Sequence, residues 1–130
     1  MKTVTSAWLA AAMDDLQSIT EIQHNEHLTN IVAFHAQQAI EKAFKAVLEE
    51  RDGTVMRIHS LETLLPKVLI HIGMDGVDFE LLEDLDKLYI DARYPGDFGL
   101  LPNGKPTIEE AAAFNEIATA IYTIISDALK

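Results

Sequence analysis

Hydrophobic and polar positions between residues 30 and 48 follow two separate helical stripes. The apolar stripe has members three or four residues apart, and it consists of Ala33, Ala36, Ile40, Ala43, Phe44 and Val47. This spacing places side chains on one face of an α-helix, and the stretch contains neither glycine nor proline. A second stripe with the same spacing is polar, and it consists of His35, Gln38, Lys42 and Glu49, with Glu41 and Lys45 beside it. We therefore expect one buried helix whose polar face is either solvated, with i,i+4 pairs such as Glu41 and Lys45, or a binding surface.

Four further helices are predicted from the same apolar spacing and from capping residues. Their expected ranges are about 6–25, 61–72, 79–93 and 108–130, while the central helix covers about 26–50. Three polar residues are expected as N-caps, and they are Ser6, Ser60 and Asp78. Thr107 and Glu110 form a predicted capping box. Gly53 follows the central helix, where glycine readily takes the left-handed conformation that ends a helix.

Pro66 lies within the third predicted helix and indicates a kink or a later start, because proline lacks a backbone donor. Residues 95–106 are rich in proline and glycine and are expected to form an irregular loop. No convincing strand pattern or internal repeat is found. The fold class is therefore predicted as all-α, an antiparallel bundle of about five helices, with a four-helix up-and-down core plus an additional helix.

The chain has 130 residues and a formal net charge of −11, and it contains no cysteine. This length favours a single domain, residues 1–130, that folds without disulfides or structural metal. The absence of cysteine excludes thiol chemistry and suits the cytoplasm, where we expect this protein. No apolar run approaches the roughly 20 residues of a membrane span, and the N-terminal apolar run is interpreted as the first helix rather than a signal peptide.

The negative charge argues against broad binding to nucleic acid, but the basic residues are unevenly distributed. Half of the ten lysines and arginines lie between residues 35 and 67, so an anionic ligand would bind there. His24 and His27 lack the spacing of a metal site, and the sequence predicts neither a metal nor a cofactor. The common phosphate-binding and nucleophile motifs are also absent from the sequence.

Two groups of polar residues remain as candidates for ligand binding. They are His35, Gln38, Lys42 and Lys45 on the central helix, and Arg93, Tyr94 and Asp97 where the fourth helix ends. Arginine offers a planar fork of donors that matches phosphate or carboxylate, and lysine adds a point charge. The alternative is structural, with Arg93 in an ion pair with Asp91 or Asp97 and Tyr94 in the core.

The segments FHAQQAIEKAFKAVL, HSLETLL and DARYPGD, which begin at Phe34, His59 and Asp91, resemble the HEPN domain family of small prokaryotic helical proteins. This resemblance spans most of the chain. It implies a homodimer with a site between the subunits, and an association with a minimal nucleotidyltransferase, often as a toxin and antitoxin pair.

Many HEPN proteins are metal-independent ribonucleases, and the resemblance implies an arginine separated by four to six residues from a histidine. Arg93 matches the arginine, but positions 98, 99 and 100 are Phe, Gly and Leu. Because histidine is the side chain best suited to acid and base catalysis near neutral pH, we leave the catalytic residues unassigned.

Three functions are consistent with the sequence. The first is a non-catalytic or weakly active module that binds a nucleotide or an RNA-related ligand beside a nucleotidyltransferase partner. The second is a ribonuclease toxin that uses Arg93 with a displaced histidine, either His35 or His59. The third is a helical interaction protein without a small ligand.

Overall fold

Five α-helices and one short 3-10 helix make up the computed structural model, which describes residues 1–55, 57–92 and 105–130. In chain order the elements are α1 Thr3–Ile22, η1 Glu26–Leu28, α2 Thr29–Asp52, α3 Leu61–Leu69, α4 Phe79–Ala92 and α5 Ile108–Leu129. The described residues form no strand. The predicted all-α bundle of about five helices is therefore confirmed.

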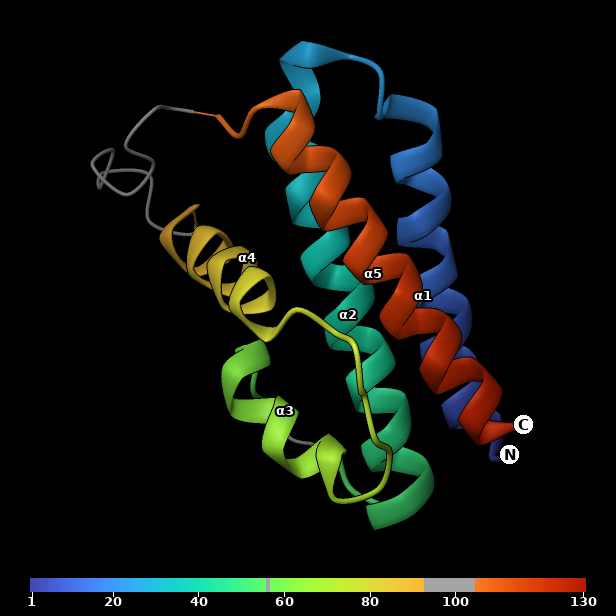
Figure 1. The fold of residues 1–130 in the computed structure, drawn as a ribbon. Coiled ribbons are helices and arrows are strands. Elements are labelled where there is room, and N and C mark those ends of the chain that lie inside the picture. The colour runs from blue at the N-terminus through green and yellow to red at the C-terminus, as the bar shows by residue number, and fades with distance from the viewer. Residues whose placement is uncertain (56, 93–104) are drawn as a thin grey trace.

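The long helices α1, α2 and α5 lie side by side, while α3 and α4 lie on the other side of α2 (Figure 1). α1 runs antiparallel to α2, and α4 also runs back toward the end at which α2 begins (Figure 1). α5 runs in the same direction as α2, so both termini lie at one end of the bundle (Figure 1). α2 packs against all four other α-helices. It is the central element of the bundle, as the breadth of its apolar stripe predicts.

The buried face of α2 explains this central place. Ile40, Ala43, Phe44 and Val47 are fully buried, and Ala36, Ala39 and Ala46 are equally inaccessible. The small alanine side chains let neighbouring helices approach α2 closely. Gly53 has a φ of 71° and donates its N–H to the backbone oxygen of Leu48, so the predicted left-handed ending of α2 is confirmed.

α1 begins at Thr3, three residues before the start that we placed at Ser6. A side chain from α2 explains the difference, since Glu50 accepts from the backbone N–H of Lys2 and from the hydroxyl of Thr5, each at 2.9 Å. These two hydrogen bonds hold the pKa of Glu50 below its ordinary value. The acceptor for the start of α1 is therefore distant in sequence, whereas our capping prediction used only local residues.

α3, α4 and α5 begin where their capping residues predict. Ser60 accepts from the N–H of Thr63 at the start of α3, and Asp78 accepts from the N–H of Leu81 in α4. The capping box of Thr107 and Glu110 at α5 is also present. α3 continues through Pro66 to Leu69, so the alternative of a later start for this helix is wrong.

Asp86 of α4 explains how α3 is held in place. Its buried carboxylate accepts from the hydroxyl of Ser60 and from the backbone N–H groups of Leu61 and Glu62, at 2.9 to 3.1 Å. A carboxylate at a helix N-terminus satisfies free N–H groups and interacts favourably with the helix dipole.

None of the described helices is both long enough and apolar enough to cross a membrane.

Candidate ligand-binding strip on the central helix

One narrow side of α2 is left uncovered by its neighbours, and it carries the residues Ile31, Phe34, His35, Gln38 and Lys42, which we name the α2 strip. Ile31 and Phe34 are 37% and 44% exposed, although both are apolar. The three polar members of the α2 strip are half-buried. The predicted polar face is therefore a mixed surface, with exposed apolar side chains at one end.

Asp15 of α1 organises the polar side of the α2 strip. One of its carboxylate oxygens lies 2.8 Å from Nδ1 of His35, and the other accepts from Nζ of Lys42 at 2.7 Å. We call these three residues the Asp15 cluster. Asp15 is buried, whereas about a quarter of the His35 and Lys42 side chains is exposed to solvent. The carboxylate fixes the imidazole and the ammonium group while leaving both within reach of a ligand.

A second polar cluster lies deeper, where α2 meets the segment that leads to α3. Oε2 of Glu41 accepts from Nζ of Lys45 at 2.8 Å and from Nδ1 of His59 at 3.0 Å. Gln37 donates to the other oxygen of Glu41 and to the backbone oxygen of His59. We call these four residues the Glu41 cluster. The Glu41–Lys45 pair is buried, so our alternative of a solvated i,i+4 pair is wrong.

Lys45 is enclosed on another side by the Trp8 ring, whose centroid lies 5.6 Å from Nζ. This cation–π contact and the Glu41 ion pair engage the ammonium group of Lys45 within the chain. Gln38 of the α2 strip donates its amide N–H to Oε1 of Gln37 in the Glu41 cluster at 2.8 Å. Gln38 thus extends the Glu41 cluster toward the half-buried surface of α2.

Aromatic rings lie next to the Asp15 cluster. The Phe34 ring meets the His35 ring edge to face, with centroids 5.3 Å apart, and its centroid is 6.0 Å from that of Tyr89 in α4. Phe34 therefore stands between α2 and α4 with nearly half of its surface open to solvent. An exposed aromatic ring beside a histidine and an amide is a suitable platform for a planar ligand.

The structure brings together His35, Gln38 and Lys42 of the predicted ligand-binding residues. It places Lys45 beneath them, in the buried Glu41 cluster. Arg93, Tyr94 and Asp97 lie outside the described residues, so their predicted role stays a prediction. No group of three or more histidine, cysteine or acidic residues in the described part of the chain could hold a metal ion.

Sequence reasoning missed Asp15 and Phe34. Asp15 falls within the apolar stripe of α1, between Ala12 and Ile19, and this position predicts a buried carboxylate that needs a partner. Phe34 gave no such signal, because periodicity does not show whether another helix covers an aromatic residue beside the apolar stripe. The role of Glu41 as the acceptor for His59 could not be predicted from the sequence either, because their contact depends on tertiary structure.

This arrangement defines an all-α bundle with a mixed polar and aromatic strip on its central helix. The family model of the HEPN domain matches residues 5–128, and the chain belongs to this family. Among solved structures it is similar to the crystal structure of TT1696 from Thermus thermophilus, with 27% sequence identity and a TM-score of 0.74. That similarity covers 98% of this chain and 99% of the other. A comparison with curated proteins gives no match.

Proposed function

We propose that this HEPN protein is a homodimeric, cytoplasmic module that binds a nucleotide or an RNA-related ligand and acts beside a minimal nucleotidyltransferase, as part of a toxin–antitoxin pair. The ligand proposal rests chiefly on one observation, the 44% exposure of Phe34 within the α2 strip. Bases stack on exposed aromatic rings, and each stacked base contributes about 1–3 kcal/mol to binding.

The other members of the α2 strip supply complementary chemistry. Gln38 uses its amide nitrogen for Gln37, and its carbonyl oxygen has no hydrogen bond in the part of the chain that the structure describes, so it can accept from a base edge. Lys42 and His35 offer donors to phosphate next to the ring. Asp15 offsets one of these charges, so we expect modest affinity that falls with rising salt.

The family suggests the proposed homodimer, and the charge indicates which face it would use. Two copies with a net charge of −11 each repel one another, so a stable contact needs a face without net charge. The α2 strip has this property, because its lysine is paired with Asp15 and its exposed residues include Ile31 and Phe34. In this proposal the ligand sits close to the dimer axis, and Arg93 completes the site.

Calorimetry tests ligand binding most directly. ATP, other nucleotides and short RNA are titrated into wild-type protein and into the variants Phe34→Ala, Lys42→Ala and Arg93→Ala. Lys87→Ala and Phe79→Ala are matched controls, since Lys87 is an exposed lysine of α4 and Phe79 is 42% exposed. We expect Phe34→Ala, Lys42→Ala and Arg93→Ala to bind these ligands more weakly than wild type, and the two controls to bind them as wild type does. Equal heats for Arg93→Ala and wild type would remove Arg93 from the site.

Light scattering at tens of micromolar protein tests the dimer. Phe34→Glu places a charge in the proposed contact and should yield monomers, whereas Phe79→Glu should leave the dimer intact. A wild-type protein that is monomeric at this concentration would contradict the homodimer. Loss of the dimer in both variants would place the contact elsewhere on the chain.

A ribonuclease toxin is the second candidate, and the contact between Asp15 and His35 favours it. A carboxylate that holds one nitrogen of an imidazole orients the other as an acid or base, which RNA cleavage through the 2′-hydroxyl requires. Such a toxin should arrest growth when it is expressed alone, and Arg93→Ala or His35→Ala should abolish the arrest. A harmless protein that binds nucleotides supports the binding module, and one without any ligand-induced melting shift supports an interaction protein.

A further inference from the structure

The side of the molecule formed by α1 and α5 faces away from the α3 and α4 pair (Figure 1). It contains a hollow of about 250 Å³. The hollow lies between the end of α1 and the first turns of α5, and we call it the α1–α5 hollow. Its apolar lining includes Val32, Ala111, Ala112 and Ile108. The volume is below the roughly 300–1,000 Å³ of most small-molecule pockets, so it suits a large side chain from another protein.

Two amide side chains at the rim have bonding capacity to spare. Asn115 donates to the side-chain oxygen of Gln23 at 3.4 Å, and Gln23 donates to the backbone oxygen of Thr20 at 3.5 Å. Both distances are at the long limit for such hydrogen bonds. Gln23 and Asn115 can therefore exchange these weak contacts for stronger ones with the main chain of a bound segment.

The surroundings of the α1–α5 hollow are acidic. α1 and α5 are described in full, and neither helix contains a lysine or an arginine. Lys105 lies three residues before α5, and its Nζ donates to the backbone oxygen of His27 at 2.7 Å. Glu109 lines the hollow itself, and Glu116 is exposed on α5 two turns further along. A second hollow, of about 380 Å³, continues along α1 and includes Asp14 and Glu21.

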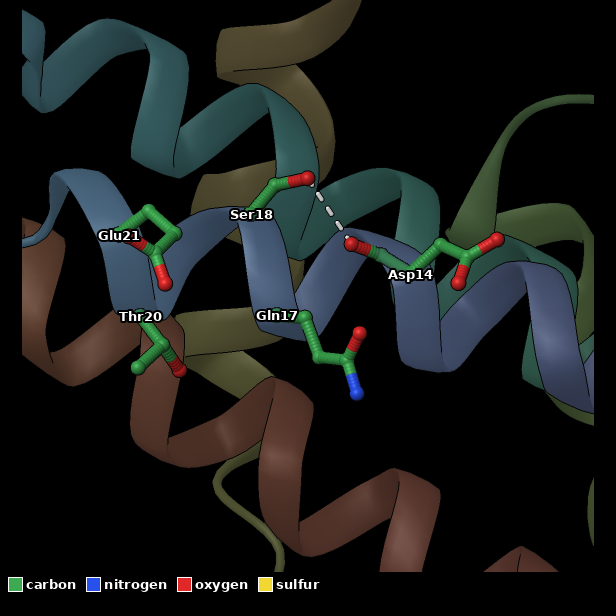
Figure 2. Close-up of a pocket in the computed structure, with 5 residues that line it drawn as sticks. All are labelled: Asp14, Gln17, Ser18, Thr20 and Glu21. Atoms are coloured by element: carbon green, nitrogen blue, oxygen red, sulfur yellow. Dashed lines mark hydrogen bonds between the residues drawn. The ribbon is translucent and has the colours of Figure 1, made fainter.

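Figure 2 shows the second hollow, with Gln17 and Thr20 projecting from α1 toward α5 and the two acids at either end. The hydroxyl of Ser18 donates to the backbone oxygen of Asp14, and this hydrogen bond does not involve the Asp14 carboxylate. Glu21 lies in the last turn of α1 and lines the second hollow, while Gln23, the residue that ends the helix, lines the α1–α5 hollow, so the two hollows lie near each other.

We infer that the α1–α5 hollow receives one large aliphatic side chain from a basic segment of a partner protein, whose lysine or arginine residues lie over Glu109, Glu21 and Asp14. Charge complementarity selects this occupant, because opposite potentials steer association and exclude like-charged partners. A basic segment matches this acidic surface better than a second copy of this chain, whose net charge is −11. The surface is separate from the α2 strip, so the inference is independent of the proposed nucleotide site.

Peptide display on the full-length protein tests this inference. A library of random peptides is selected for binding to wild type, and the recovered peptides are measured against Ala112→Leu, which fills the hollow from an exposed position. Ala120→Leu is the matched control, since Ala120 is an exposed alanine of the same helix and is not part of the hollow's lining. We expect recovered peptides to combine leucine, isoleucine or methionine with lysine or arginine, and to bind Ala112→Leu at least tenfold more weakly.

Charge reversal provides a second readout that does not depend on filling the hollow. Glu109→Lys should weaken the same peptides several-fold and reduce the salt dependence of binding, whereas Glu83→Lys on α4 should not. Circular dichroism of each variant verifies that the helices are intact. Recovery of acidic peptides, equal binding to the two leucine variants, or no enrichment at all would overturn the inference. None of these results would bear on nucleotide binding at the α2 strip.

Discussion

The Asp15 cluster and the Glu41 cluster each combine one carboxylate, one lysine and one histidine around α2, but water reaches their lysines to different extents. The Lys42 side chain is 26% exposed, and that of Lys45 is 6% exposed beneath Trp8. Lys42 can exchange part of its ion pair for a ligand at little cost. Lys45 cannot, because separation from Glu41 would leave a buried charge without a partner. Burial therefore separates a candidate ligand residue from a structural one.

The histidines show the opposite order of exposure. His35 of the Asp15 cluster is 25% exposed, whereas His59 of the Glu41 cluster is 48% exposed. His59 precedes α3 and joins this segment to α2 through Glu41 and Gln37. The Glu41 cluster therefore positions α3, while the Asp15 cluster ties α1 to α2 and leaves two donors at the surface.

Removal of the buried carboxylate should have the largest effect. Glu41→Ala leaves the Lys45 ammonium group buried and unpaired, and we expect a loss of about 3–5 kcal/mol in the free energy of unfolding. Urea denaturation measures it. The double variant Glu41→Leu with Lys45→Met should recover most of this loss, since apolar residues of similar volume often replace a buried ion pair well. A loss below about 1 kcal/mol for Glu41→Ala would mean that Lys45 readily reaches water.

Asp15→Ala should destabilise the protein less, by about 1–3 kcal/mol, because His35 and Lys42 are partly hydrated already. The same denaturation experiment makes the comparison, and Asp14→Ala is a suitable control because Asp14 is an exposed neighbour in α1. Equal losses for Asp15→Ala and Glu41→Ala would remove the distinction between the two clusters. A loss no greater than that of Asp14→Ala would make the Asp15 contacts irrelevant to stability.

These clusters also mark how far the sequence predicts the structure. The helices, the cap at Ser60, the capping box at Thr107 and the ending at Gly53 depend on neighbours in sequence, and each was predictable. The start of α1 was placed three residues late, because its acceptor Glu50 lies 48 residues away from Lys2.

The candidate site was predictable only in part, for the same reason. The stripe of His35, Gln38 and Lys42 followed from helical periodicity, which orders residues around one helix. Periodicity does not show which residues another helix covers, so it grouped the buried Lys45 with the exposed members. It also gave no indication that α1 would place Asp15 against His35 and Lys42.

Glu50 of α2, which accepts hydrogen bonds from the start of α1, should make a smaller, pH-dependent contribution to stability. Glu50 has a pKa below its ordinary value near 4.5, because Lys2 and Thr5 donate to its carboxylate in the folded state. Its contribution to stability is therefore complete above about pH 4.5 and is lost as the pH falls through the lower, folded-state pKa. Thermal unfolding of wild type and Glu50→Gln should differ near pH 7 and converge in acid. A difference that persists unchanged in acid would contradict this assignment.

Phe34→Ala should have the smallest effect on stability and the clearest effect on binding. The Phe34 ring is 44% exposed, so its loss should lower the free energy of unfolding by less than about 1 kcal/mol. Phe44→Ala, ten residues further along the same helix, is the matched comparison and should cost about 3–5 kcal/mol, because Phe44 is fully buried. Denaturation of both variants, together with nucleotide titration of Phe34→Ala, separates the two roles. If Phe34→Ala binds ATP and short RNA as wild type does, the ring is no ligand platform, and its exposure belongs to a contact between proteins.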